Sequence, residues 1–195
     1  MHFGEPFGGL MPGARGAVLA VLLRTGAPLT GRRVHALVGG HSLGAVQQAL
    51  RDLERIGVIT TETVGRAGVH RINDAHEAIA PLRSLSSPIE MLTRVVREAA
   101  TDVEAVIVFG SVPRGEARAD SDIDLVVIAP EDWDGRPDLQ QHVHERLGND
   151  CDVLHLTRED FARAPKDREP VIAEMLRDGF ALVGTMPRPS RRKAS

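Results

Sequence analysis

The chain contains few aromatic residues and a single cysteine. Aromatic residues make up 3% of its 195 residues, with one tryptophan and no tyrosine. Proteins that bind single-stranded nucleic acid without sequence preference stack the bases on aromatic side chains, so this class of function is not expected. Having only one cysteine, Cys151, the chain can form neither an internal disulfide nor a cysteine-based zinc site, which fits a reducing compartment.

Long hydrophobic runs are also missing. No apolar stretch reaches the roughly 20 residues that a membrane-spanning helix needs. The first residues, Met1 to Glu5, lack the basic region and apolar core of a signal peptide. Hydrophobic residues at 42% and charged residues at 26% are ordinary for a globular protein. We therefore expect a soluble cytoplasmic protein without membrane contact, long enough for two small domains.

The net charge is small but unevenly distributed. The first 73 residues contain eight arginines and four acidic residues, a surplus of four positive charges. Because the whole chain carries −3, the remainder carries −7. Such an asymmetry indicates different partners for the two halves, the first of them polyanionic.

The first half has the pattern of three short helices followed by a β-hairpin. A loose arm rich in glycine and proline is expected at residues 1–13. Apolar periodicity and capping residues then predict three helices, and alternation around a glycine turn predicts two strands, at 14–24, 30–38, 42–56, 58–64 and 69–72. This order resembles the winged helix-turn-helix family, so we predict such a domain over residues 1–80.

In that family the third helix enters the major groove of DNA. By position, the side chains that would contact bases or phosphates from this helix are Ser42, Gln47, Gln48 and Arg51. Arg66, at the tip of the hairpin, would reach the backbone or the minor groove. The resemblance implies double-stranded promoter or operator DNA as a partner. It also implies a homodimer on a palindromic site, although no segment demands one. The alternative is a domain of this fold that serves only protein contacts.

The second half alternates strands and helices, which is typical of an α/β domain. Residues 73–86 are expected to be a connection, with Pro81 breaking any continuous helix. The second domain is predicted over 87–185, and a basic disordered tail over 186–195. Helices are predicted at 88–101, 138–147 and 171–177, and a further helix is predicted to begin at 157. The predicted strands lie at 106–109, 125–128, 152–156 and 180–183.

One motif joins the first two of these strands. Gly110 and Ser111 follow the first strand, and after ten intervening residues Asp122 and Asp124 open the second. The spacing of two places both carboxylates on one face of a strand, where like charges repel unless a cation lies between them. Magnesium binds through one or two carboxylates together with substrate phosphates. The motif therefore predicts a site for a metal-bound triphosphate. The alternative is a pair of solvated turn carboxylates.

This motif is similar to the signature of the DNA polymerase β-like nucleotidyltransferase superfamily. Over about residues 88–184 the chain most resembles the minimal nucleotidyltransferases, which implies a nucleotidyltransferase palm. By resemblance, Asp122, Asp124 and Asp152 would hold two magnesium ions, and Asp152 would act on the attacking hydroxyl. The residues implied for binding the nucleotide are Gly110, Ser111, Arg114 and Ser121. Pro113 departs from the family pattern, in which a small residue is usual.

The resemblance implies metal-dependent transfer of a nucleoside monophosphate to a hydroxyl on a partner. The donor would be ATP or another triphosphate. Minimal nucleotidyltransferases often act as antitoxins that adenylylate a cognate toxin, and the first domain would then supply autoregulation by binding DNA. Two alternatives remain open. One is a winged-helix transcription regulator whose second domain only senses nucleotide or binds a partner. The other is a transferase whose basic first domain holds a tRNA or DNA acceptor.

Overall fold

The computed structural model describes residues 1–118, 120–163 and 170–186. The chain divides into two compact units, Glu5–Pro88 and a second unit that combines Met1–Gly4 with Ile89–Ser195. The predicted tail lies outside the described residues except for Met186. None of the described helices is long and apolar enough to cross a membrane.

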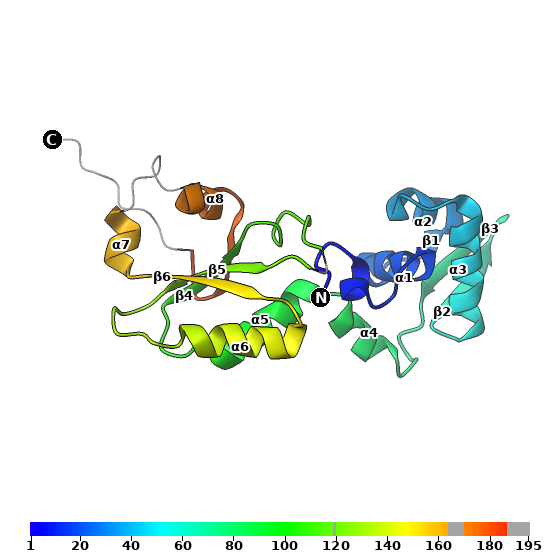
Figure 1. Ribbon diagram of the computed structural model, residues 1–195. Helices are drawn as coiled ribbons and strands as arrows, with labels where there is room; N and C mark the ends of the chain where they lie inside the picture. Colours follow the sequence, from blue (N-terminus) through cyan, green and yellow to red (C-terminus); the bar gives the residue numbers. More distant parts are fainter. Residues whose placement is uncertain (119, 164–169, 187–195) are drawn as a thin grey trace. The chain divides into compact units, whose positions relative to one another are not determined.

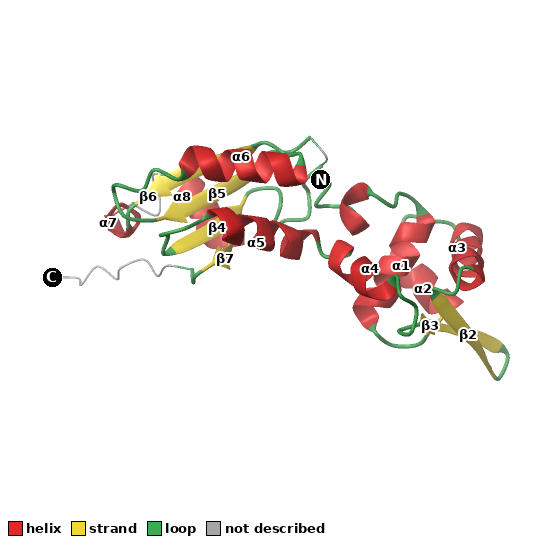
Figure 2. Ribbon diagram, turned by 90° about the horizontal axis from the view of Figure 1, so that it is seen from below, coloured by secondary structure: helices red, strands yellow, loops and turns green. Residues whose placement is uncertain are grey.

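The first unit packs helices against a three-stranded antiparallel sheet of order β1-β3-β2 (Figures 1 and 2). Its elements are η1 (Pro6–Gly9), α1 (Ala14–Thr25), β1 (Leu29–Thr30), α2 (Gly31–Val38), α3 (Leu43–Arg55), β2 (Ile59–Val64), β3 (Ala67–Ile72) and α4 (Ile79–Leu85). The hydroxyls of Thr30 and Ser42 accept hydrogen bonds from the backbone N–H groups of Arg33 and Ala45 and so begin α2 and α3. The three predicted helices and the hairpin are therefore confirmed to within a few residues.

Two predictions in this region were wrong. Residues 1–13 are not a loose arm, because Phe3 and Phe7 are buried, at 9% and 0% exposure. Burying two aromatic side chains stabilises the segment enough to order it despite its glycines. Residues 73–86 contain α4, in which Pro81 is the third residue. The missing N–H costs no helical hydrogen bond in a first turn, so proline is tolerated there.

The second unit is a four-stranded sheet of order β6-β5-β4-β7, in which β5 and β6 are parallel and the other pairs antiparallel. Its elements are α5 (Pro88–Ala99), β4 (Ala105–Phe109), β5 (Ile123–Ile128), α6 (Arg136–Leu147), β6 (Cys151–Leu156), α7 (Arg158–Arg163), α8 (Pro170–Asp178) and β7 (Phe180–Val183). The predicted α/β architecture of this half is confirmed. All predicted strands are present, with β4, β5 and β6 each beginning one or two residues earlier than predicted.

Helices cover both faces of this sheet (Figure 1). On one face α5 and α6 pack against Val106 and Val108 of β4. On the other face α7 and α8 contribute Phe161, Ile172 and Met175, which pack against Ile107 and Phe109. Because both faces are covered, β4 is apolar at every position, as its sequence indicated.

Candidate active site

The sheet places Asp124 and Asp152 directly beside each other. They are register partners on the parallel strands β5 and β6. In β5, Ile123 and Leu125 pack under α5 and α6, whereas Val126 belongs to the core under α8. Alternation along the strand therefore places Asp124 on the α8 face. Asp122 precedes the first residue of β5 and is exposed, so it lies in the loop rather than in the strand.

Asp124 lies close to other negatively charged side chains. Burial raises the pKa of the Asp124 carboxyl, and the negative charges of Asp152 and Asp122 raise it further. The neighbouring thiol of Cys151 responds in the same way, because burial and then the three aspartates raise its pKa to about 12. Asp124 is thus close enough to Asp152 and Asp122 to be repelled by both. A divalent cation would relieve that repulsion.

The donor set fits magnesium. All three side chains offer carboxylate oxygens, the hard ligands that this ion prefers. Within the described residues, no group of three or more histidine, cysteine or carboxylate side chains lies close enough together to hold a metal ion by itself. An ion held by one or two carboxylates and completed by substrate phosphates does not require one.

Gly110 lies directly against the Asp124 carboxylate. Its φ is +74°, in the left-handed region that favours glycine. A Cβ built at this position would meet Asp124 Oδ2 far inside van der Waals contact and would lie 3.2 Å from its Cγ. The glycine therefore serves two purposes, the turn after β4 and the room for the carboxylate.

Turns rather than a helix follow Gly110. The backbone N–H of Gly115 donates to the Val112 carbonyl, and the N–H of Glu116 donates to the Ser111 carbonyl. No helix is present at residues 111–116, and Pro113 lies in these turns.

The loop just before Asp122 is held by hydrogen bonds. The Ser121 hydroxyl accepts from the backbone N–H of Arg118. The Ser121 carbonyl accepts from the amide of Asn149, whose exposure is only 2%. Sequence reasoning missed Asn149, because a single asparagine after a helix carries no pattern. Its role is structural, since it fixes the backbone that leads to Asp122.

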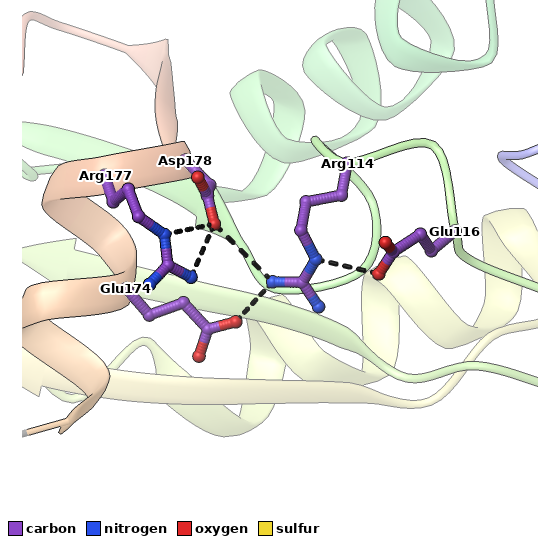
Figure 3. A network of polar contacts seen from close by, with 5 residues as sticks. All are labelled: Arg114, Glu116, Glu174, Arg177 and Asp178. Atoms are coloured by element: carbon purple, nitrogen blue, oxygen red, sulfur yellow. Dashed lines mark hydrogen bonds and ion pairs between the residues drawn. The ribbon is translucent and has the colours of Figure 1, made fainter.

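Arg114 reaches across the loop to α8 (Figure 3). Its Nε donates to Glu116 at 2.8 Å, and its Nη1 pairs with Glu174 and lies 3.8 Å from Asp178. The hydrogen bonds that Arg114 donates to Glu116 and Glu174 raise its pKa. Arg114, which was predicted to bind the triphosphate, is thus surrounded by carboxylates that were not identified from the sequence.

The first unit brings together only some of the predicted DNA contacts. Gln47, Arg51 and Arg66 line one hollow of about 730 Å³ between α3 and the hairpin. Arg32 lines it too and was missed, because the sequence does not show that α2 approaches the hairpin. Glu54 also lines this hollow.

Two predicted contacts lie elsewhere on α3. The Gln48 amide donates to Asp52 at 3.0 Å and lines a different hollow, with Ala45 and Ala49. Ser42 caps the helix.

Comparisons with known proteins bear on the second unit. Residues 90–166 match the family model described as polymerase beta, nucleotidyltransferase. A search of curated proteins gave no significant match.

Several solved structures of toxin–antitoxin pairs are similar at low identity. A toxin–antitoxin structure with AMP-PNP has 23% identity and a TM-score of 0.39, covering 50% of this chain and 74% of that one. A tri-AMPylated Shewanella oneidensis HEPN toxin in complex with an MNT antitoxin has 22% identity and a TM-score of 0.33, covering 50% and 70%. Such scores are too low to assign a function. The family match agrees with the motif and the sheet, and the chain therefore contains a polymerase β-type nucleotidyltransferase domain, the enzyme class that its sequence predicted.

Proposed function

We propose that the second unit transfers a nucleoside monophosphate, AMP from ATP, to a hydroxyl group on a partner protein. The observation that carries this proposal is the register pairing of Asp124 with Asp152 beside Gly110. Two carboxylates on adjacent strands, next to a glycine turn that can approach a phosphate, suit a bound triphosphate. The protein acceptor, in an antitoxin-type reaction with a cognate toxin, comes from the motif resemblance.

Each predicted residue has a role in this reaction. Asp122, Asp124 and Asp152 would hold magnesium, which when bound would neutralise the charge that develops on the phosphates. The acceptor oxygen forms a bond to the α-phosphorus, the bond from that phosphorus to the bridging oxygen breaks, and pyrophosphate leaves. Asp152, which is more exposed than Asp124, would take the proton of the acceptor hydroxyl. Gly110, Ser111, Arg114 and Ser121 would bind the nucleotide.

Transfer can be measured directly with labelled ATP. We expect label to appear on a partner protein when the chain is incubated with magnesium, ATP labelled in the α-phosphate, and the products of genes adjacent to its own. The Asp152→Asn variant should lower the rate by about 10²-fold or more, the usual size of a lost general base. Binding of ATP without transfer to any acceptor would favour the alternative, a regulator that only senses nucleotide.

We further propose that the first unit binds promoter DNA through a winged helix-turn-helix fold. Supporting this are its element order and the hollow where three arginines, Arg32, Arg51 and Arg66, converge with Gln47. Arginine pairs with phosphate or guanine and glutamine with adenine, and both can act from one helix in a groove. Magnesium-dependent transfer and DNA binding are separable activities, because each is assigned to its own unit.

Replacing Arg51 by alanine should weaken binding to the upstream DNA by about tenfold or more, the cost of one lost arginine contact. Gln47→Ala should do the same on specific DNA. Arg24→Ala is the matched comparison, because Arg24 is an exposed arginine at the end of α1 and does not line the hollow. A gel shift measures all three. Unchanged affinity in both Arg51→Ala and Gln47→Ala would show that this helix does not read the DNA.

A further inference from the structure

Helix α8 covers the face of the sheet on which the carboxylates of the candidate site lie. Ile172 and Met175 are buried against Ile107 and Val126. Asp124 shares the face of Val126, and Asp152 shares that of Leu154, which packs against the same cluster. The polar side of α8 therefore borders the place where a triphosphate would lie.

That polar side presents two carboxylates one turn apart, Glu174 and Asp178, and both approach Arg114 (Figure 3). Asp178 is already engaged by Arg177, whose Nε and Nη2 donate to it at 3.0 and 2.8 Å. Among the described residues Glu174 forms its ion pair with Arg114 alone. The contact between Glu174 and Arg114 joins two segments 60 positions apart in the chain.

The guanidinium has two edges that can hold a phosphate by two parallel hydrogen bonds, Nε with Nη2 and Nη1 with Nη2. Glu116 occupies Nε on the first edge, and Glu174 occupies Nη1 on the second. A phosphate can therefore take a two-bonded edge of Arg114 only if one carboxylate leaves. Glu116 lies two residues from Arg114 in the same loop, whereas Glu174 belongs to another element and can separate from it.

We propose that Glu174 is an internal competitor of the nucleotide, holding on Arg114 the place that a triphosphate oxygen takes when substrate binds. Release of Glu174 accompanies binding of the triphosphate and lowers the affinity for it. The carboxylate thereby sets the concentration of nucleotide at which the site fills. This inference rests on the proposed function, because it requires that Arg114 bind the triphosphate.

The electrostatics support the proximity that this competition needs. Burial is the main cause that raises the pKa of Asp124, followed by the charges of Asp152, Asp122 and Glu174, whereas Arg114 lowers it. The pair of Glu174 and Arg114 therefore acts on the same carboxylate that the triphosphate and its cation would approach.

Calorimetric titration of the full chain with a non-hydrolysable ATP analogue and magnesium tests the proposal. Glu174→Gln keeps the shape of the side chain and removes its charge, so we expect the Kd to fall about two- to fivefold, as for loss of a partly exposed ion pair. Glu159→Gln is the matched control, since Glu159 pairs with an arginine one turn away in α7. Its Kd should equal that of the wild type.

The double variant separates competition from general repulsion. In an Arg114→Gln background, Glu174→Gln should no longer change the Kd, because the contact it relieves is already lost. Equal tightening in both backgrounds would mean that Glu174 only repels the triphosphate, and weaker binding in Glu174→Gln alone would mean that it positions Arg114. Either result overturns the proposal. If the wild type and every variant bind no nucleotide and transfer no label, the proposed function fails, and this inference fails with it.

Discussion

Asp124→Asn is expected to lower nucleotidyl transfer by about 10³-fold, the size associated with losing one group that stabilises charge in a transition state. The amide has the shape of the carboxylate, but it is a poor ligand for magnesium. Asp124 lies between Asp152 and the Gly110 turn. No other described carboxylate lies between them that could replace it. Initial rates with labelled ATP measure the loss.

The same substitution should stabilise the protein in the absence of metal and nucleotide. Burial and like charges disfavour the ionised Asp124, and its raised pKa means that the folded state holds a proton that the unfolded state releases as pH rises. Between the ordinary pKa of an aspartate and the raised pKa of Asp124, the free energy of unfolding therefore falls as pH rises. Asparagine cannot ionise, so the variant avoids this fall. We expect the Tm near pH 7 to rise by about 2–4 °C, the shift that accompanies roughly 1 kcal/mol in a chain of this size.

Asp120→Asn is the control for both measurements. Asp120 is exposed in the loop before the motif, so neither activity nor Tm should change appreciably. A lower Tm for Asp124→Asn without metal would show that the ionised carboxylate is stabilised where it lies. Activity near the wild-type level in Asp124→Asn would show that Asp124 is not part of the active site.

Gly110→Ala is expected to reduce transfer by about 10²-fold, the cost of displacing a catalytic group by about 1 Å. The new Cβ would collide with the Asp124 carboxylate, which we propose as a magnesium ligand. The positive φ adds a backbone cost of about 1–2 kcal/mol for a residue other than glycine. Activity and thermal melting together measure the two effects.

Gly148→Ala separates the collision from the backbone cost. Gly148 has a φ of +75°, nearly that of Gly110, but nothing lies within 4 Å of the Cβ it would gain. Gly148→Ala should lose only the stability that the backbone cost accounts for, and only Gly110→Ala should lose activity. Equal activity in the two variants would contradict a role for the close approach of Gly110 to Asp124.

Much of this protein could be predicted from local sequence patterns. Alternation and apolar runs located the strands, because a strand covered on both faces must be apolar throughout, as β4 is. Capping residues located the helices, since Thr30 and Ser42 satisfy backbone N–H groups only at a helix start. The spacing of Gly110, Ser111, Asp122 and Asp124 indicated the chemistry, because it requires only a turn between two adjacent strands.

Contacts between distant segments could not be predicted in this way. The pairing of Asp152 with Asp124 was anticipated only through resemblance, since strand order and register depend on how the whole sheet packs. The burial of Phe7 overrode a local pattern that favoured disorder. Arg32 joined the arginines of α3 and the hairpin only because the helices and the sheet of the first unit pack together.

The sequence by itself determined the two strands, the turn and the aspartates of the motif, because these depend on neighbours within about 20 residues. Tertiary structure alone decided what surrounds Arg114. Its guanidinium pairs with Glu174 because α8 buries Ile172 and Met175 on the sheet and must turn its charged side toward the loop. A helix can bury only one side, and which charged residue then meets which loop depends on packing that no local pattern records.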